Sequence, residues 1–453
     1  MTNYSKSLFI FRRDLRINDN TALNLALKSS KTVIPCFIFD PVQINKHAYQ
    51  SVPGLQFMLS SIKSLQQQLQ QQGSELNCFY GHPESLIKEL YQAQKIDAVF
   101  VNRDYSPFSR KRDQAIFQCC QQLKIQLHYV SDALINDPEQ VLKPDASAYK
   151  VFTPFYNKAK SIPVPLPQAL ETGKFCAVLD KKYQYDFHPL IDKSSHIISL
   201  GGSEQAHKLL NKLQDYEGYQ QQKDFPALAA TSRLSAHLKF GTCSVRQVHY
   251  VIASQLGTEH PLIRQLYWRD FFTHIGFHYP QVFGHAFHKK YDAIVWSKNL
   301  DLFQAWAAGK TGFPIVDAGM RELNQTGFMH NRVRMITASF LVKDLHISWR
   351  WGERYFAQHL IDYDPCVNNG SWQWAASTGC DAQPYFRIFN PWLQQQKFDA
   401  NCEYIQQWIP ELKGIDTTII HKWDKKHFTC AYPAPIVDHK IQSTQAKELF
   451  KNC

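Results

Sequence analysis

The first 130 residues alternate short apolar runs with amphipathic stretches, and this alternation limits the possible folds more than any other feature of the chain. The apolar runs lie at residues 7–11, 32–39, 76–80, 97–102 and 126–130. Helical patterns lie between them, at residues 20–29, 56–72, 83–94 and 108–123. Strands and helices that alternate in this way form a parallel sheet with helices on both faces. We therefore expect an α/β domain with a doubly wound parallel sheet over residues 1–132.

Local signals support these boundaries. Gly73 follows the second helical pattern in the position where helices often end in a left-handed residue, and residues 18–20 (Asn-Asp-Asn) offer caps for the first helix. The turn after the first strand reads RRDLRIND. It lacks the G-x-G-x-x-G pattern of dinucleotide-binding domains. Any nucleotide that this protein binds is therefore expected elsewhere in the chain.

The remainder of the chain changes character twice. Residues 133–200 are rich in proline and have only brief periodic stretches, which predicts a connector. From residue 201 to 453 the pattern is helical, with candidate helices at 203–215, 243–255, 260–277, 314–325, 331–345 and 349–360. All ten tryptophans lie at or after Trp268. We expect an all-helical domain there, and we expect the chemistry to lie in it.

The segment at residues 362–391, DYDPCVNNGSWQWAASTGCDAQPYFRIFNP, mixes Trp, Asn and Asp without a clear amphipathic period. This composition is unusual for a core segment. Aromatic faces beside amides and carboxylates suit a pocket that holds a flat ring and hydrogen-bonds to its edges. The segment therefore predicts a site for a heterocyclic cofactor or a nucleobase.

Charge and composition narrow the class of protein. The chain has 50 Lys and Arg against 39 Asp and Glu, a formal net charge of +11, which favours a polyanionic partner. No apolar run approaches the roughly 18 residues of a membrane span. The eleven cysteines form no C-x-x-C pattern and no signal peptide precedes them, which favours a reduced cytoplasm. His274 and His278 have the spacing of a zinc helix but lack its general-base Glu, so we expect no metal site.

Two expected helices carry candidate binding faces. Gln265, Trp268 and Arg269 share one face of the helix at 260–277. Asn331, Arg334 and Met335 share a face of the helix that begins at residue 331, whereas Arg332 points elsewhere. The residues alone do not separate a binding face from a packed aromatic stripe or a solvated arginine face.

Two shorter groups have open interpretations as well. The run TSRLS comprises Thr231, Ser232, Arg233, Leu234 and Ser235 and offers hydroxyl and backbone N–H donors, either to a diphosphate or as helix caps. Asp362 and Asp364 lie two residues apart outside a regular helix. They suit a metal or acid–base site, or the N–H and ribose edges of a flavin.

Four longer segments together resemble the photolyase/cryptochrome family in order and spacing. They are DFPALAATSRLSAHL, YWRDFF, KTGFPIVDAGMRELNQTGFMHNRVRMITASFLVKDL and the segment at 362–391. More narrowly, the chain resembles the bacterial class I cyclobutane pyrimidine dimer photolyases. The resemblance extends from FRRDLRINDN to YPAPIVDHK. It implies an N-terminal α/β antenna domain and a C-terminal helical domain that binds FAD and DNA.

The resemblance also implies the residues that bind FAD. Asp362 and Asp364 match positions on the isoalloxazine and ribose side, and Arg334 matches the arginine that pairs with the first of them. Asn368 matches an asparagine that faces flavin N5, where an amide can hydrogen-bond to either redox form. The diphosphate positions correspond to Tyr219, Thr231, Ser232, Arg233, Leu234 and Ser235.

A second set matches the positions that bind the flipped-out lesion and its DNA. Trp268 and Trp374 match the aromatic walls of the lesion pocket, and Met335 and Asn331 line it. The related (6-4) photolyases carry His at both of the last two positions, so the resemblance favours cyclobutane dimer repair. The other expected contacts to lesion or DNA are Gln265, Arg269, Lys223, Arg332 and Gln394.

Trp372, Trp349 and Trp296 match a relay that carries an electron from the surface to photoexcited flavin. The chain departs from the class I pattern at Gln265, where those enzymes have Glu, which leaves the proton balance of ring splitting open. It also has Phe108 and Ser109 where folate-binding members have Asn and Glu. A folate antenna is therefore disfavoured, and a deazaflavin, a flavin or no antenna remains open.

The sequence thus predicts an FAD-dependent lyase that repairs cyclobutane pyrimidine dimers by light-driven electron transfer from reduced FAD to the flipped-out lesion. We expect it to be a cytoplasmic monomer with damaged DNA as its partner and with no obligate protein partner. One alternative is a cryptochrome-like photoreceptor, which Trp268, Met335 and the lack of a tail beyond Cys453 disfavour. The other is a (6-4) photolyase, which Asn331 and Met335 disfavour and Gln265 slightly favours.

Overall fold

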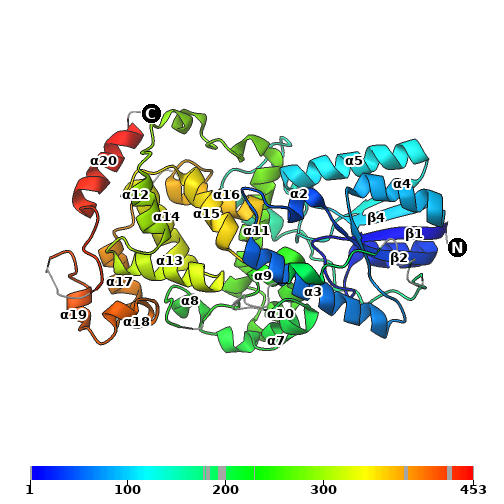
Figure 1. Ribbon diagram of the computed structural model, residues 1–453, viewed down its shortest axis with the longest axis horizontal. Coiled ribbons are helices and arrows are strands. Elements are labelled where there is room, and N and C mark those ends of the chain that lie inside the picture. Colours follow the sequence, from blue (N-terminus) through cyan, green and yellow to red (C-terminus); the bar gives the residue numbers. More distant parts are fainter. Residues whose placement is uncertain are drawn as a thin grey trace. The chain divides into compact units, whose positions relative to one another are not determined.

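The computed structural model describes residues 3–176, 179, 184–191, 200–228, 230–381, 386–425, 431–451 and 453. Parts of the expected connector (177–178, 180–183 and 192–199), and residues 382–385 of the Trp- and amide-rich segment, lie outside them. The chain divides into two compact units (Figure 1). Unit 1 comprises Met1–Asp215 and Ser232–His278, and unit 2 comprises Tyr216–Thr231 and Tyr279–Cys453. The helices at 232–278, which the sequence grouped with the helical domain, thus belong to the same compact unit as the sheet.

Unit 1 contains a five-stranded parallel sheet with strand order β3-β2-β1-β4-β5. Its strands are β1 (Tyr4–Phe11), β2 (Ser30–Phe39), β3 (Asn77–Tyr80), β4 (Ala98–Asn102) and β5 (Gln126–Val130). Its helices are α1 (Thr21–Ser29), α2 (Pro41–Ile44), α3 (Val52–Gln71), α4 (Pro83–Gln94), α5 (Pro107–Leu123), α6 (Phe152–Ala159), α7 (Ser203–Leu210), α9 (Ser235–Phe240), α10 (Val245–Leu256) and α11 (Pro261–His278). The expected parallel α/β fold is confirmed.

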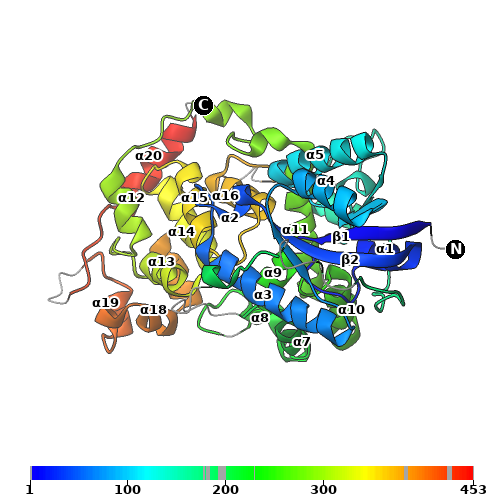
Figure 2. The ribbon, with the colours of Figure 1, turned by 45° about the vertical axis from the view of Figure 1, so that its right-hand side comes forward.

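The helices cover both faces of this sheet because the chain reverses direction across it. β1, β2 and β3 follow one another toward one edge, and β4 and β5 continue on the other side of β1. Since crossovers between parallel strands are right-handed, this reversal places the later helices on the opposite face. Figures 1 and 2 show α4 and α5 together on one side of the strands and α3 on the other. The expected caps are present, since Asn20 accepts from Leu23 N and Gly73, with a φ of +70°, follows α3.

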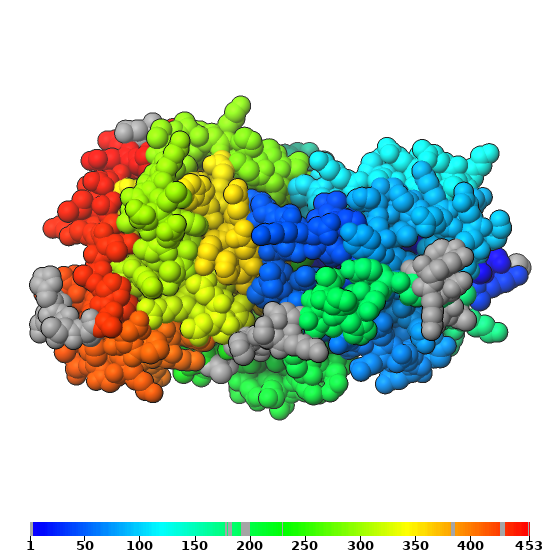
Figure 3. Space-filling view, in the orientation of Figure 1, coloured from blue at the N-terminus to red at the C-terminus, as the bar shows by residue number. Residues whose placement is uncertain are grey.

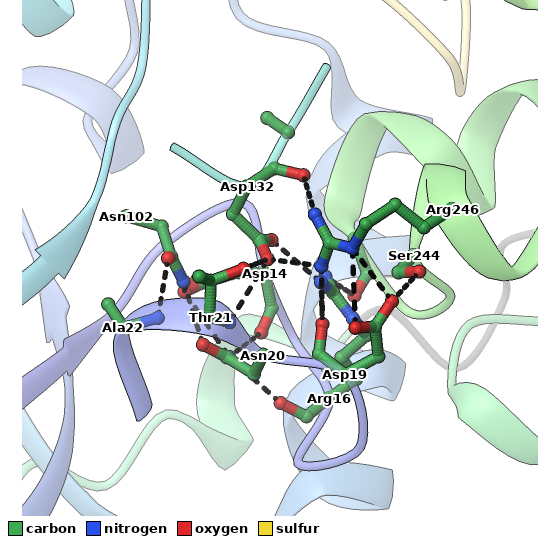
Figure 4. A network of polar contacts seen from close by, with 12 residues as sticks. Asp14, Arg16, Asp19, Asn20, Thr21, Ala22, Asn102, Asp132, Ser244 and Arg246 are labelled. Carbon is green, nitrogen blue, oxygen red and sulfur yellow. Dashed lines mark hydrogen bonds and ion pairs between the residues drawn. The ribbon is translucent and has the colours of Figure 1, made fainter. Parts of the chain in front are cut away.

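A buried network of polar side chains joins α10 to the segments that follow β1 and β5 (Figure 4). Arg246 Nη2 donates to Asp132 Oδ1 at 2.8 Å and Nε to Asp19 Oδ2 at 3.1 Å. Arg16 donates to the second oxygen of Asp132 at 2.7 Å. Burial alone would raise the pKa of Asp132, but the two guanidinium groups lower it to about 2. This clamp explains why the helices after residue 231 group with the sheet.

The regular elements in the described part of unit 2 are helices, joined by irregular segments. Its helices are α8 (Tyr219–Gln222), α12 (Leu300–Ala307), α13 (Pro314–Thr326), α14 (Asn331–Lys343), α15 (Trp349–His359), α16 (Pro365–Ala376), α17 (Pro391–Phe398), α18 (Glu403–Trp408), α19 (Thr417–Ile420) and α20 (His439–Lys451). Short 3-10 helices among the described residues are Pro138–Gln140, His188–Leu190, Leu213–Tyr216, Pro280–Val282, Lys289–Ala293 and Pro410–Leu412. Figure 3 shows α20, in red, on the surface of this unit beside yellow-green residues of the same unit.

The core of unit 2 is built around α13, α14, α15 and α16, which carry about half of its buried hydrophobic residues. Gly352 on α15 is necessary for this packing, because a Cβ there would lie 2.1 Å from the Trp372 ring on α16. None of the described helices is long and apolar enough to cross a membrane. The described residues also contain no cluster of three or more His, Cys, Asp or Glu side chains that could hold a metal ion.

The expectation that residues 362–391 avoid the core is wrong for α16. Asn368, Asn369, Trp372 and Gln373 are all buried. Their amides are accommodated because they find hydrogen-bond partners on neighbouring segments, as described next. Asp362 and Asp364 do lie outside a regular helix, as expected.

Candidate active site

An ion pair between α14 and the turn after α15 is the first part of the candidate site. Arg334 Nη1 donates to Asp362 Oδ1 at 3.1 Å, and Nη2 donates to Asp362 Oδ2 at 3.0 Å. The third nitrogen, Nε, donates to the backbone carbonyl of Met329 at 2.8 Å. A bidentate pair fixes the plane of the carboxylate as well as its position. The structure therefore contains the expected Arg334–Asp362 pair, whereas its contact with a flavin stays a prediction.

Asp364 and Asn368 are set by α16 itself. Asp364 is the N-cap, and its Oδ1 accepts from Cys366 N at 2.9 Å and from Val367 N at 3.1 Å. Asn368 follows one turn later, and its Nδ2 donates to the backbone carbonyl of Glu353 at 3.0 Å. Because a carbonyl only accepts, this bond identifies which end of the amide is nitrogen. The Asn368 oxygen is therefore directed away from Glu353.

Sequence reasoning missed a buried network on the neighbouring face of α16. Asn369 Nδ2 donates to Glu353 Oε1 at 2.9 Å and to Val282 O at 3.1 Å. Gln373 Nε2 donates to Asn369 Oδ1 at 3.1 Å and to Val282 O at 3.0 Å. Burial raises the pKa of Glu353 to about 7, against the lowering effect of its bond from Asn369. The i, i+4 spacing of Asn369 and Gln373 was the available signal for this network.

The three predicted relay tryptophans all lie in unit 2. Trp349 and Trp372 are almost fully buried, whereas Trp296 is partly exposed and contacts Phe450 at 5.9 Å between ring centroids. Among the described rings, Trp372 has contacts with Phe356 at 4.8 Å and with Trp306 at 6.2 Å. Sequence reasoning did not single out Trp306. The relay assignment of the three expected tryptophans stays a prediction.

The residues expected at the diphosphate are divided between the two units. In unit 2, Tyr219 is the first residue of α8 and is buried, and burial followed by the charge of Asp224 raises its pKa to about 12. In unit 1, Arg233 is exposed and has a φ of +52°, and buried Leu234 precedes α9. The other expected diphosphate residues are Thr231 and Ser232, which are half-buried, and Ser235, which is exposed.

In unit 2, the residues expected at the lesion share a face of α14. Asn331 and Met335 are adjacent there, with Asn331 Nδ2 at 3.8 Å from Met335 Sδ. Arg332 points elsewhere, as expected, and its Nη2 lies 2.8 Å from Asp224 Oδ1. The same guanidinium lies over the Phe398 ring at 4.4 Å. The solvated arginine considered at this position is therefore an ion-paired one.

The remaining unit 2 candidates are less constrained. Arg387 lies over the half-buried Trp374 ring at 5.6 Å, and Lys223 Nζ lies 6.0 Å from the centre of the Tyr219 ring. Gln394 on α17 has a buried Oε1 without a hydrogen-bond partner in the described part of the chain. DNA contact by Lys223 and Gln394 stays a prediction.

In unit 1, α11 carries the other lesion residues. Trp268 is half-buried and stacks on Phe152 with centroids 3.6 Å apart and an interplanar angle of 6°. Gln265 is exposed, and its Nε2 lies 3.4 Å from the carbonyl of Pro261. Arg269 donates to the carbonyls of Ala133 at 2.7 Å and Leu238 at 3.4 Å. These bonds give Arg269 a structural role within unit 1, and its contact with a lesion stays a prediction.

The groups gathered on α14, α15 and α16 fit FAD. They offer two carboxylates, Asp362 held by Arg334 and Asp364 at the N-terminus of α16. They also offer the buried Asn368 amide, whose oxygen is directed away from the Glu353 carbonyl, and the Trp372 indole one turn later on α16. A flavin edge presents both N–H donors and carbonyl acceptors, and such a donor and acceptor set can satisfy them.

Comparison with known families assigns both parts of the chain. Residues 7–171 match the family described as DNA photolyase, and residues 262–452 match the FAD binding domain of DNA photolyase. The deoxyribodipyrimidine photo-lyases of Alkalihalophilus pseudofirmus and Escherichia coli are each 39% identical to the chain, and each alignment covers 97% of both sequences.

Solved structures agree with this assignment. An archaeal photolyase from Sulfolobus tokodaii, described as containing two FAD molecules, has a TM-score of 0.91 at 42% identity and covers 99% of this chain and 100% of its own. A cryptochrome from Synechocystis has a TM-score of 0.89 at 27% identity, with coverage of 99% and 100%. The expected family, fold class and cofactor domain are therefore confirmed, and the chain belongs to the DNA photolyase family.

Proposed function

We propose that this protein is a deoxyribodipyrimidine photo-lyase that splits cyclobutane pyrimidine dimers in DNA under blue light. The observation that carries the proposal is the set of fixed polar side chains Arg334, Asp362, Asp364 and Asn368 within the segment that matches the FAD-binding family model. The similar curated proteins are named deoxyribodipyrimidine photo-lyases, which supports the choice of lesion. When bound, reduced FAD supplies the electron that the dimer takes up and later returns.

The chain's own residues position the cofactor. Asp362, held by Arg334, would accept from the N–H edge of the ring, and Asp364 would lie on its ribose side. Asn368 has its nitrogen committed to the carbonyl of Glu353, so its oxygen is the atom left to face N5. An amide in this position accepts a hydrogen bond from a protonated N5 and does not supply a proton. Tyr219 and residues 231–235 would bind the diphosphate.

Other residues would receive the flipped-out dimer and its DNA. The Trp268 ring, backed by Phe152, would provide one aromatic wall, and Trp374 would provide another. Met335, Asn331 and Gln265 would line the pocket, and Gln265 can donate to a thymine carbonyl at any pH. Extrusion of a damaged base step costs less than that of a normal one, which adds selectivity.

Phosphate contacts would come from Lys223 and Arg332, with Gln394 beside them. Arg332 is paired with Asp224, so a phosphate would have to replace or share this ion pair. The net charge of +11 supports a polyanionic partner. We further propose that the protein acts as a monomer in the cytoplasm, in keeping with its scattered cysteines.

The test is illumination of the purified, FAD-loaded and chemically reduced protein with an oligonucleotide that contains one cyclobutane dimer. We expect light-dependent recovery of the pyrimidine absorbance, with none in the dark. A parallel sample that contains a (6-4) lesion should remain unrepaired. Repair of that lesion instead would favour the (6-4) alternative, and repair of neither lesion would favour a photoreceptor.

A further inference from the structure

Trp306 on α12 is a buried tryptophan that the proposed function does not use. It is fully buried, and its ring centroid lies 6.2 Å from that of Trp372, with an interplanar angle of 72°. Among the ring contacts of the described residues, this one alone joins two tryptophans. Trp372 is also the first member of the predicted relay. Trp306 therefore provides a second tryptophan to which Trp372 could pass an oxidised state.

The hydrogen bonds of the two indoles give this transfer a direction. Trp306 Nε1 donates to the carbonyl of Thr337 at 3.0 Å. Trp372 Nε1 is buried and has no hydrogen-bond partner in the described part of the chain. An oxidised indole is a cation, and a carbonyl at its N–H stabilises that cation by a charge-assisted hydrogen bond. Trp306 is therefore easier to oxidise than Trp372, so an electron moves from Trp306 to oxidised Trp372.

A path continues from Trp306 to a partly exposed indole. Phe303 contacts Trp306 at 5.7 Å and Trp351 at 5.2 Å between ring centroids. Trp351 lies on α15 and is partly exposed. Phe303 resists oxidation, but its ring contacts both indoles and so bridges them. Trp351 can therefore exchange electrons with Trp306 on one side and with a reductant in solution on the other.

Tyr355 is a less suitable exit although its ring lies 5.5 Å from Trp306. Its hydroxyl oxygen lies 2.8 Å from Asn324 Oδ1 and 3.0 Å from Ala307 O, and its single proton is donated to these two acceptors. Oxidation of a tyrosine requires loss of this proton, and neither acceptor is a base. Burial also raises the pKa of Tyr355 to about 12. Trp351 has no such requirement, because an indole can be oxidised first and lose its proton to water afterwards.

We infer that Trp306 and Trp351 form a second electron-transfer branch that joins the predicted relay at Trp372. The inference rests on the proposed photoreduction of FAD through Trp372. Trp372 gives one electron to photoexcited oxidised FAD. Trp306 then gives one electron to oxidised Trp372, and Trp351 gives one electron to oxidised Trp306. Trp351 then releases its N–H proton to water. A thiol in solution restores Trp351 with one electron and one proton, so FAD gains one electron and the thiol loses one.

The test compares tryptophan variants of the FAD-loaded, oxidised protein by transient absorption of tryptophan radicals and by the rate of photoreduction with a thiol. Trp349→Phe interrupts the expected relay and should retain part of the parent rate. Adding Trp306→Phe should lower the rate to that of Trp372→Phe. Trp423→Phe, which removes a buried indole that contacts the Tyr432 ring, is the matched control and should behave as the parent.

A further variant leaves Trp306 in place and changes the partly exposed Trp351 instead. Trp351→Phe in the Trp349→Phe background should shorten the radical lifetime and remove the deprotonated indole signal, with FAD content unchanged. The inference is overturned if photoreduction in Trp349→Phe alone is as slow as in Trp372→Phe. It is also overturned if adding neither Trp306→Phe nor Trp351→Phe slows photoreduction of the Trp349→Phe variant further. Dimer splitting by chemically reduced protein tests the proposed function separately, because that reaction needs no relay.

Discussion

Glu353 offers a direct test of the electrostatics around the candidate site. Its carboxyl group is buried on α15, accepts one hydrogen bond from Asn369, and has a pKa raised by burial from 4.5 to about 7. A carboxyl group whose pKa is higher in the folded than in the unfolded chain stabilises the folded state when it is protonated, and this stabilisation is lost when it ionises. The folded protein should therefore lose stability as the pH rises from 4.5 to about 7. One pKa unit is worth about 1.4 kcal/mol, so the loss should reach about 3 kcal/mol.

The substitution Glu353→Gln should remove this loss, because an amide oxygen can still accept from Asn369 but carries no charge. The free energy of unfolding should be measured by urea denaturation at several pH values, with FAD in excess so that cofactor binding contributes equally. The advantage of the variant over the parent should grow by about 3 kcal/mol between about pH 4 and pH 8. The pH dependence of this stability difference should follow the titration curve of a single group.

Glu448→Gln, at an exposed position on α20, is the control and should show no such growth. Infrared spectroscopy offers a second readout, since the parent should show a protonated carboxyl band near pH 6 that the Glu353→Gln variant lacks. A stability difference that stays constant with pH would refute the reasoning, because it would mean that Glu353 ionises as it does in the unfolded chain.

Three further predictions concern the lesion, the DNA and the relay. Trp268→Ala should weaken binding to dimer-containing DNA by roughly 1–3 kcal/mol while FAD remains bound. Trp408→Ala, which removes another half-buried indole, should leave this binding unchanged. If Trp268→Ala binds dimer-containing DNA as tightly as the parent does, Trp268 does not line the lesion pocket. Arg332→Ala should reduce the slope of log affinity against log salt concentration by about one unit, for damaged and undamaged duplex alike. The control Arg321→Ala should leave this slope unchanged. An unchanged slope in Arg332→Ala would mean that Arg332 stays paired with Asp224 in the complex. Trp372→Phe should photoreduce far more slowly but still repair dimers after chemical reduction; loss of that repair would place Trp372 in the splitting step itself.

Most of the fold could be predicted because its signals are local. Period-two and period-3.6 patterns depend only on neighbouring residues, and the five strands and the longer helices lie within a few residues of their expected bounds. The grouping of α9, α10 and α11 with the sheet could not be predicted in this way. It depends on Arg246, whose partners Asp19 and Asp132 lie more than a hundred residues away in the sequence.

The candidate site shows the same division. Arg334 and Asp362 were paired through family resemblance, since no spacing rule relates residues 28 positions apart. The role of Glu353 was missed because a glutamate inside an amphipathic helix is usually solvated. Arg332 was considered a solvated residue, whereas it has a partner, Asp224, in a distant segment. In each case the deciding information is which group on another element comes within hydrogen-bond distance.

The amide-rich composition of α16 follows from its two tasks. Asp364, Asn368 and Trp372 recur every four residues and so share one face, which brings the cofactor candidates and the start of the relay onto one helix. Asn369 and Gln373 lie on the adjacent face and donate to the backbone carbonyl of Val282. Backbone carbonyls on packed segments move less than side chains, so these bonds fix the rotation of α16 about its axis. An apolar face would bury the helix as well, but it would not set the direction of the Asn368 amide. The polar residues that obscured the helix in the sequence are therefore the ones that hold the predicted site in place.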